Sequence, residues 1–308
     1  MKAISVSVPG SIMLMGEHAV LFGEPAIACA IDKYIHIQLT PRNDDGVNIE
    51  SALASHQTRL RQIKSHPALT FVMAAISQLE RTLPAGFELT IESEFAHTVG
   101  LGSSAAVTAG VVAALHAYAQ LPMDTEALFD RALSVVHEVQ QGRGSGSDLV
   151  ASIQGGLVAY RMHPKTITAL SGQPVLGLYY AGYKTPTPEV LKQVETKTAA
   201  FPELYSELYR LMGLVTEQAI AAIESSDWTA VGLLMNTYQG LLDALGVNDA
   251  VLSEMVYQLR QEQSVLGAKI SGSGLGDCVV SLGGAPKLQW NEQIPVAISE
   301  RGVSVEYH

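Results

Sequence analysis

Apolar and polar residues alternate in several short segments, which is the pattern of half-buried strands. The strands predicted on this basis cover residues 4–8, 35–40, 47–51, 87–92, 157–160, 175–180, 269–270 and 278–282. Apolar residues recur at helical spacing over residues 66–83, 105–119 and 125–139, and residues 187–263 are mostly helical in pattern. Because strands and helices mix without strict β-α-β alternation, the pattern predicts an α+β fold.

Polar and turn residues cluster at residues 165–173, just ahead of the long helical block. A chain of 308 residues is expected to form about two domains or one large unit. We therefore predict one domain over residues 1–168 and a second over residues 169–308.

Composition narrows the class of protein. A hydrophobic content of 47% supports a large core, and a formal net charge of −11 argues against nucleic acid as a main partner. No apolar run reaches the roughly 18 residues of a membrane span. The N-terminal apolar run is interrupted by Gly, Glu and His, so we expect neither a signal peptide nor a membrane partner. Cys29 and Cys278 lie far apart without a CxxC spacing, which fits a cytoplasmic protein with reduced thiols and gives no metal signal.

The segment from Val99 to Ala106, VGLGSSAA, joins a predicted strand to a predicted helix. A Gly/Ser turn that opens a helix leaves backbone N–H groups free at the positive end of the helix dipole, which favours phosphate. No Gly-Lys-Ser/Thr closes the segment, so it is not a Walker A loop. The alternative is an ordinary helix cap by Ser103 or Ser104. A serine hydroxyl at a phosphate loop is also an oxygen donor suited to Mg²⁺.

Two further segments place an acid at a turn. The apolar run over residues 9–15 ends in Gly-Glu-His, where Glu17 and His18 suit a polar ligand, or else form a hairpin with a solvated acid and a capping histidine. The Gly/Ser loop over residues 142–147 leads to Asp148 and contains Arg143. A carboxylate held against a cation stays ionised and orients or deprotonates a hydroxyl; the alternative is a helix N-cap.

A second glycine-rich loop follows the strand predicted at residues 269–270. Its alternating glycines allow close approach to a ligand, or form a hairpin turn. Lys184 precedes two threonines and suits an anionic substrate, although a helix start explains the segment equally well. We expect structural roles for His97 and His137. Two phosphate-type loops and an isolated acid together indicate a phosphoryl-transfer site.

These pieces, in this order, resemble the GHMP small-molecule kinases. The segments PGSIMLMGEHAVLFGEPAIACAID, GLGSSAAV and KISGSGLGDC are similar to the three motifs of that family, and MNTYQGLLDALGVN is similar to a helix that flanks the substrate. The resemblance covers nearly the whole chain. It implies a two-domain fold with an N-terminal ATP-binding domain and a C-terminal helix-rich α+β domain. The first motif is most similar to mevalonate kinases, whereas GSGSDLVAS and the Gly-Asp-Cys of the third motif look more like phosphomevalonate kinases.

The resemblance implies ATP and Mg²⁺ as cofactors and assigns roles to individual residues. Asp148 is the implied catalytic residue, which accepts or orients the proton of the substrate hydroxyl. The ATP phosphates are assigned to Gly100, Leu101, Gly102, Ser103, Ser104 and Ala105, and Mg²⁺ to Ser104 and Glu138. The acceptor substrate is assigned to Ser11, Glu17, His18, Lys184, Gly272 and Ser273, with Gly274 supporting the wall of the site.

The sequence departs from the mevalonate kinase pattern at two positions. Ser11 stands where the first motif normally carries Lys, and Arg143 or Lys184 is left to supply that charge. His137 aligns with a Mg²⁺-binding Glu, and Glu138 is one residue off.

The function predicted from the resemblance is ATP-dependent phosphorylation of the primary hydroxyl of mevalonate. A phosphomevalonate kinase and a catalytically impaired nucleotide- or metabolite-binding homologue stay open as alternatives, the latter because of Ser11. The expected partner is a small-molecule substrate, and a homodimer stays open.

Overall fold

The computed structural model describes residues 2–96, 99–288 and 292–308. Among these, eight strands form one sheet in the order β12-β1-β2-β5-β3-β4, with β6 also paired to β2 and β7 paired to β6. The strands are β1 (Ile4–Met15), β2 (Ala26–Pro41), β3 (Gly46–Ser51), β4 (Ser55–Arg59), β5 (Phe87–Ser93), β6 (Leu157–Arg161), β7 (Thr166–Leu170) and β12 (Ser304–Tyr307). The β3–β5 pair is parallel and the other pairs are antiparallel.

A second, antiparallel sheet has the strand order β11-β8-β10-β9. Its strands are β8 (Leu176–Lys184), β9 (Gly267–Ser271), β10 (Gly276–Leu282) and β11 (Glu292–Ile294). The described α-helices are α1 (Thr70–Leu79), α2 (Ser103–Ala119), α3 (Thr125–Gln140), α4 (Ser147–Gln154), α5 (Thr187–Thr198), α6 (Pro202–Glu224), α7 (Trp228–Leu245) and α8 (Ala250–Gln261). Two short 3₁₀ turns, η1 (Ala19–Phe22) and η2 (Pro67–Leu69), complete the set. No helix in this described part of the chain is long and apolar enough to cross a membrane.

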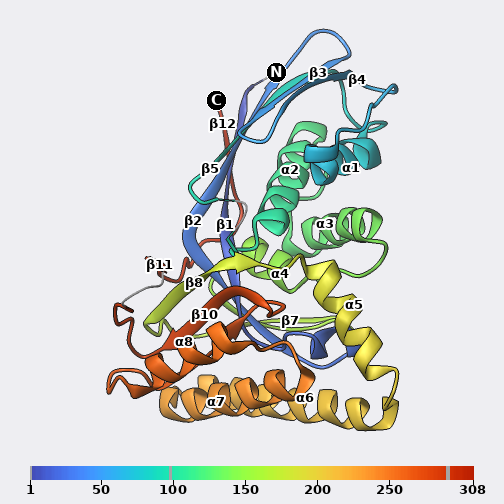
Figure 1. Ribbon diagram of the computed structural model, residues 1–308. Helices are drawn as coiled ribbons and strands as arrows, with labels where there is room; N and C mark the ends of the chain where they lie inside the picture. The colour runs from blue at the N-terminus through green and yellow to red at the C-terminus, as the bar shows by residue number, and fades with distance from the viewer. Residues whose placement is uncertain (1, 97–98, 289–291) are drawn as a thin grey trace.

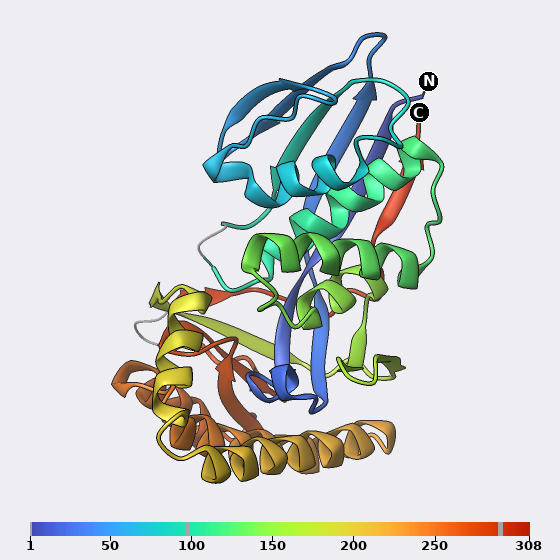
Figure 2. The ribbon, with the colours of Figure 1, turned by 90° about the vertical axis from the view of Figure 1, so that its right-hand side faces the viewer.

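The helices divide between the two sheets (Figures 1 and 2). Helices α1 to α4 lie together on one side of the first sheet, where α2 and α4 contact β1 and β2. Helices α7 and α8 pack on β9 of the second sheet, and α6 packs on α7. Each group buries its own apolar core, but β1 and β2 supply residues to both cores. The two long strands therefore connect the two halves of the molecule.

Strand β1 is longer than the alternation predicts, because it continues through Pro9 to Met15. Proline lacks the N–H that a sheet needs, so a strand passes through it only at an irregularity. The register of β1 against β2 shifts between Pro9 and Gly10. Before this shift Val8 belongs to the core of the first sheet; beyond it Ile12 and Leu14 belong to the core of the second sheet, while Met13 stays in the first.

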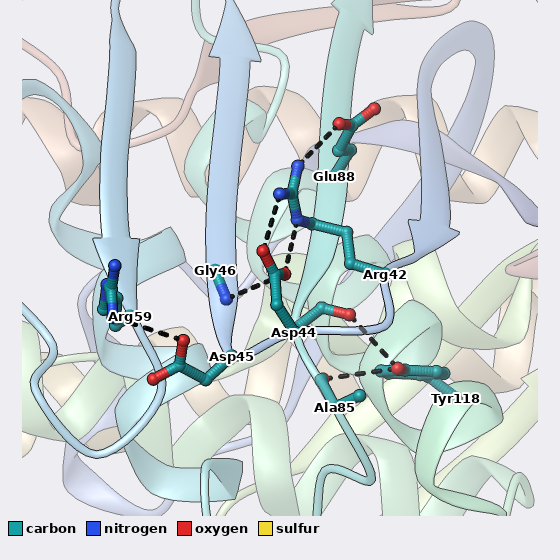
Figure 3. A network of polar contacts seen from close by, with 9 residues as sticks. Arg42, Asp44, Asp45, Gly46, Arg59, Ala85, Glu88 and Tyr118 are labelled. Carbon is teal, nitrogen blue, oxygen red and sulfur yellow. Dashed lines mark hydrogen bonds and ion pairs between the residues drawn. The ribbon is translucent and has the colours of Figure 1, made fainter.

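The turn that follows β2 is held by a surface network of polar contacts (Figure 3). The Arg42 guanidinium donates to both carboxylate oxygens of Asp44, at 2.7 and 2.8 Å, and to Glu88 at 3.0 Å. The Tyr118 hydroxyl of α2 lies 3.2 Å from the carbonyl oxygens of Ala85 and Gly86. These contacts hold the turn after β2 and the start of β5 together, and they hold the start of β5 against α2.

The C-terminal residues return to the first half of the molecule. Strand β12 pairs with β1, and both termini lie side by side in Figures 1 and 2. The predicted boundary at residue 168 stays a prediction; it falls within β7, which pairs with β6 of the first sheet.

The helical predictions at residues 105–119 and 125–139 are confirmed as α2 and α3, with α2 starting two residues earlier at Ser103. The helix predicted over residues 66–83 is too long. Its first turn is 3₁₀, and α1 ends at Leu79, where the carbonyl accepts from both the N–H and the hydroxyl of Thr82. The sequence prediction missed β4, β7, β11 and β12, because short edge strands carry little periodic signal.

Candidate active site

The loop ahead of α2 has the geometry of an anion site. Gly102 is the N-cap of α2 with φ +63°, and no side chain of the described residues caps this helix end. The suggested cap by Ser103 or Ser104 is therefore wrong. A Cβ at Gly102 would lie 2.1 Å from the Ser11 hydroxyl oxygen, so the close approach of loop and strand requires glycine. The first-turn N–H groups of Ser103 to Ala105 stay without a side-chain acceptor, which suits a phosphate.

Asp148 lies in the first turn of α4 and does not cap it, because the N-cap is Gly146. Its Oδ1 instead accepts from the Ser11 hydroxyl at 3.0 Å. The backbone N–H of the fully buried Ser11 donates to the Leu101 carbonyl at 3.0 Å. Ser11 thus links the phosphate-type loop to the carboxylate, although residues 11 and 148 are far apart in the sequence.

Burial raises the pKa of Asp148 above its ordinary value. The hydrogen bond from Ser11 and the positive charge of Lys184 lower this pKa, while the nearby carboxylates of Asp277 and Glu17 raise it. A carboxylate whose proton affinity is raised accepts a proton from a hydroxyl more readily.

Glu17 follows β1 and is buried, so the alternative of a solvated acid at this turn is wrong. The ammonium of Lys269, fully buried on β9, donates to Glu17 Oε1 at 2.5 Å and also to the Ile270 carbonyl. Burial lowers the pKa of Lys269. The Tyr238 hydroxyl donates to the Glu17 carbonyl at 3.0 Å, which anchors the turn to α7.

His18 has φ +61° and its Nε2 donates to the Ser273 carbonyl at 2.9 Å. Burial lowers the pKa of His18, so the ring is neutral near pH 7. The glycine-rich loop that contains Gly272 and Ser273 joins β9 to β10, so it is a hairpin connection as well as part of the site. The contact of His18 with Ser273 holds the first and third motifs together.

Lys184 ends β8, and its ammonium lies 2.8 Å from Asp277 Oδ2 on β10. Asp277 is buried, and its other carboxylate oxygen has no hydrogen-bond partner among the described residues. A Cβ at Gly100 would lie 2.2 Å from Asp277 Oδ1, so the phosphate-type loop packs directly on this carboxylate.

A cavity of about 850 Å³ brings most of the predicted site together. Eleven predicted residues line it: Glu17, His18, Gly100, Gly102, Ser103, Ser104, Ala105, Asp148, Lys184, Gly272 and Ser273. Ser11 and Leu101 lie behind this wall and contact it through the hydrogen bonds given above, and Gly274 packs on Val247.

Glu138 is not brought into this cavity. Its exposed carboxylate on α3 accepts from the Gln78 side chain at 2.7 Å. The neighbouring His137 contacts the Gly144 carbonyl at 2.8 Å and holds the loop before Asp148. His97 lies outside the described residues.

Sequence reasoning did not assign Asp277, Lys269 or the apolar wall of the cavity. Asp277 was visible inside the third motif, but nothing in its local sequence indicates a partner at Lys184. The apolar wall includes Leu53, Leu69, Phe71, Val72, Ile91 and Phe95, which come from separate elements of the first half of the chain. No local pattern connects these residues.

Oxygen donors in the cavity suit a magnesium ion bound with phosphates, and the described residues form no preformed metal cage. Among the described residues, no group of three or more His, Cys, Asp or Glu side chains is placed to hold a metal ion. The Ser104 hydroxyl and the Asp148 and Asp277 carboxylates line the cavity. Mg²⁺ is commonly held by one or two such groups together with substrate phosphates.

Comparison with known proteins gives the family. The family models described as GHMP kinases N terminal domain and GHMP kinases C terminal match residues 70–156 and 219–293. Mevalonate kinase of Pyrococcus furiosus is 31% identical over 94% of this chain and 91% of its own length. Mevalonate kinase of Aeropyrum pernix is 30% identical over 91% and 89%. The chain therefore belongs to the GHMP kinases and is a small-molecule kinase. Within that family it is mevalonate kinase-like.

Solved structures share the fold. The Lin0012 protein from Listeria innocua has a TM-score of 0.86 at 20% identity and covers 99% of both chains. L. major mevalonate kinase in complex with R-mevalonate has a TM-score of 0.74 at 21% identity, covering 95% of this chain and 94% of its own. Streptococcus pneumoniae phosphomevalonate kinase, in complex with phosphomevalonate and AMPPNP, has a TM-score of 0.76 at 19% identity, covering 94% and 99%. The predicted two-domain α+β fold is confirmed.

Proposed function

We propose that this protein transfers the γ-phosphoryl group of ATP to the primary hydroxyl of mevalonate. The observation that carries the proposal is the placement of Asp148, which lines the cavity close to the N-terminus of α2 and is fixed by the Ser11 hydroxyl at 3.0 Å. A carboxylate and an anion-binding helix end that open into one cavity bring a proton acceptor and a phosphate together.

The triphosphate is proposed to bind the free N–H groups at the start of α2. The apolar side chains of Leu69, Phe71 and Phe95 line the same cavity and suit a nucleoside base. Mg²⁺ held by the phosphates and the Ser104 hydroxyl would neutralise charge on the phosphoryl oxygens. The contacts of Glu138 give no support for it as a further ligand.

In the proposed reaction, Asp148 accepts the proton of the acceptor hydroxyl. That oxygen forms a bond to the γ-phosphorus as the bond from phosphorus to the β–γ bridging oxygen breaks, and the electron pair leaves with ADP. Burial raises the pKa of Asp148, which favours its role as proton acceptor. The remaining rate enhancement comes from positioning and from charge neutralisation.

The charge of the cavity favours mevalonate over phosphomevalonate. The Lys and Arg residues among its described lining are Arg143 and Lys184, against the four carboxylates of Glu17, Glu94, Asp148 and Asp277. An acceptor that itself carries a phosphate needs more cationic groups than an acceptor with one carboxylate. Relatives about 30% identical are named mevalonate kinase, which supports the same choice.

The acceptor is tested by measuring ADP release from the purified protein with ATP, Mg²⁺ and either acceptor. Turnover with mevalonate supports the proposal. Turnover with phosphomevalonate alone contradicts the choice of acceptor. ATP binding without turnover on either acceptor supports a binding protein, the function class that the serine at position 11 leaves open.

Asp148→Asn tests the assigned proton acceptor. We expect kcat to fall by about a thousandfold or more, because general base and orientation are lost together, while ATP affinity stays within a few-fold. Asp45→Asn is the control, since this exposed carboxylate pairs with Arg59 outside the cavity (Figure 3). Near-normal kcat in Asp148→Asn, measured beside the control, would show that another group takes the proton.

A further inference from the structure

Phosphoryl transfer develops negative charge that a fixed cation stabilises, so the position of the cations in the cavity matters. The motif position occupied by Ser11 carries no charge. Arg143 lies in an exposed loop, and no ion pair among the described residues fixes its guanidinium. Lys269 is fully buried against Glu17 and is not part of the described lining of the cavity. Lys184 is the remaining lysine or arginine of the described lining, and it is fixed in place.

Three contacts fix Lys184. Its ammonium pairs with Asp277 Oδ2 at 2.8 Å, and its backbone pairs with Gly276 across the β8–β10 ladder. The hydroxyl of the next residue, Thr185, donates to the Leu275 carbonyl at 2.7 Å. The side chain is 31% exposed, so it keeps access to a ligand in the cavity.

Asp277 occupies an irregular position that aims its carboxylate at this site. Gly276 pairs with Lys184 while Cys278 pairs with Tyr180, so the ladder is irregular here and residues 181–183 of β8 bulge opposite Asp277. Its φ of +70° lies in the left-handed region, which few non-glycine residues adopt. Such strain persists where the surrounding structure enforces it, and here the carboxylate is only 6% exposed.

We propose that Lys184 is the cation that neutralises charge on the transferring phosphoryl group, and that Asp277 is the positioning residue that holds it. The inference rests on the proposed kinase function and deepens it. Asp277 is engaged in the ion pair with Lys184, whereas Asp148 has no ion pair among the described residues, so Asp148 is left as the proton acceptor. The bonds formed and broken are those of the reaction given above, with no further co-reactant. The charge absent at position 11 is thus supplied from β8, on the other sheet.

The first test compares kcat and KM in four variants. Lys184→Met should lower kcat about a hundredfold or more, with KM for ATP changed only a few-fold, because the charge acts mainly in the transition state. Lys184→Arg should restore part of kcat. Asp277→Asn should lower kcat by a smaller factor, because the cation is retained but not held. Lys165→Met is the matched control: this lysine is 32% exposed and ion-paired, but lies outside the cavity. A kcat of Lys184→Met within threefold of the control contradicts the proposal.

The second readout is the acid limb of the pH profile of kcat/KM, which reports Asp148. The groups that face Asp148 are Ser11 from β1, Lys184 from β8, Asp277 from β10 and Glu17 after β1. Losing the positive charge in Lys184→Met should move the limb to higher pH, and losing the negative charge in Asp277→Asn should move it to lower pH. If Lys184 and Asp277 were merely structural, the two substitutions would not shift the acid limb in opposite directions. Acid limbs that do not shift, or that shift in the same direction in both variants, contradict the proposal.

A third readout separates this inference from the choice of acceptor. ADP with Mg²⁺ and aluminium fluoride mimics the transferring phosphoryl group, and its binding is measured by calorimetry. Wild-type protein should bind this mixture at least tenfold more tightly than Lys184→Met, while ADP alone binds both equally. Equal binding of the mixture overturns the inference whichever acceptor is used. The wild-type protein can bind the mixture more tightly than Lys184→Met and yet turn over neither acceptor. In that case the proposed function fails and the role of Lys184 stands.

Discussion

The buried pair of Lys269 and Glu17 joins the first and third motifs by an ion pair. The side chains are 0% and 2% exposed, and the ammonium lies 5.4 Å from the centroid of the Tyr238 ring. Both charges have been removed from water, so each is tolerated only because the other is present. One carboxylate oxygen of Glu17 has no partner among the described residues, which leaves this pair sensitive to any change.

We predict that Lys269→Met lowers the free energy of unfolding by about 3–5 kcal/mol, because it leaves the Glu17 carboxylate buried and uncompensated. The measurement is denaturant unfolding at pH 7. Arg210→Met is the control, since its pair with Glu207 is about 70% exposed on both sides and contributes roughly 0–1 kcal/mol.

The double variant Glu17→Gln/Lys269→Met provides the check. It removes both charges, so we expect it to recover part of the stability lost in Lys269→Met. A Lys269→Met variant as stable as Arg210→Met would show that the buried pair is not coupled in this way.

At the scale of elements, the start of α2 decides how the phosphate-type loop is shaped. Local sequence was sufficient to place a Gly/Ser turn before a helix, and the helix does begin there. It was not sufficient to tell a glycine cap from a serine cap, because the choice depends on Ser11 of β1 packing against Gly102. The same limit applies at α4, where a partner on β1 explains why Asp148 does not cap its helix.

Gly102→Ala should weaken nucleotide binding at least tenfold, or about 1.4 kcal/mol. Gly156→Ala is a matched control, because both glycines have nearly the same φ, +63° and +66°, and should pay the same left-handed strain. A Cβ at Gly156 meets nothing within 4 Å, whereas a Cβ at Gly102 meets the Ser11 hydroxyl at 2.1 Å. Only the Gly102 variant must therefore move the loop.

Calorimetric titration with ADP measures this difference, and thermal unfolding measures the shared strain. If the two variants bind ADP equally, the loop before α2 is not the nucleotide site.

At the scale of the whole molecule, β1 and β2 connect the two cores, because each strand contributes buried side chains to both. On β2, Ile27 belongs to the core of the second sheet and Ile37 to the core of the first, and both are at most 2% exposed. Strand β12 provides a second connection, since it returns from the second half of the chain to pair with β1. Backbone hydrogen bonds, as well as the continuous chain, therefore connect the two halves of the molecule.

We predict a single cooperative unfolding transition in scanning calorimetry. Ile27→Ala and Ile37→Ala should each cost about 2–5 kcal/mol and lower the temperature of that same transition. Both positions hold the same residue on the same strand, so each serves as control for the other. Two resolved transitions, with each variant shifting only one, would show that the halves unfold independently.

The sequence by itself determined the α+β class, most helices and the order of the glycine-rich motifs, because these follow from local periodicity and from residue types at short spacing. The resemblance of those motifs to known proteins gave the family. Only the tertiary structure decided the pairs Ser11–Asp148, Glu17–Lys269 and Lys184–Asp277. Each pair joins residues brought together by strand register and by the packing of the two sheets, which no local pattern encodes. For the same reason, the sequence left two cations open as substitutes for the charge absent at position 11, and the proposed choice of Lys184 rests on its pairing with Asp277.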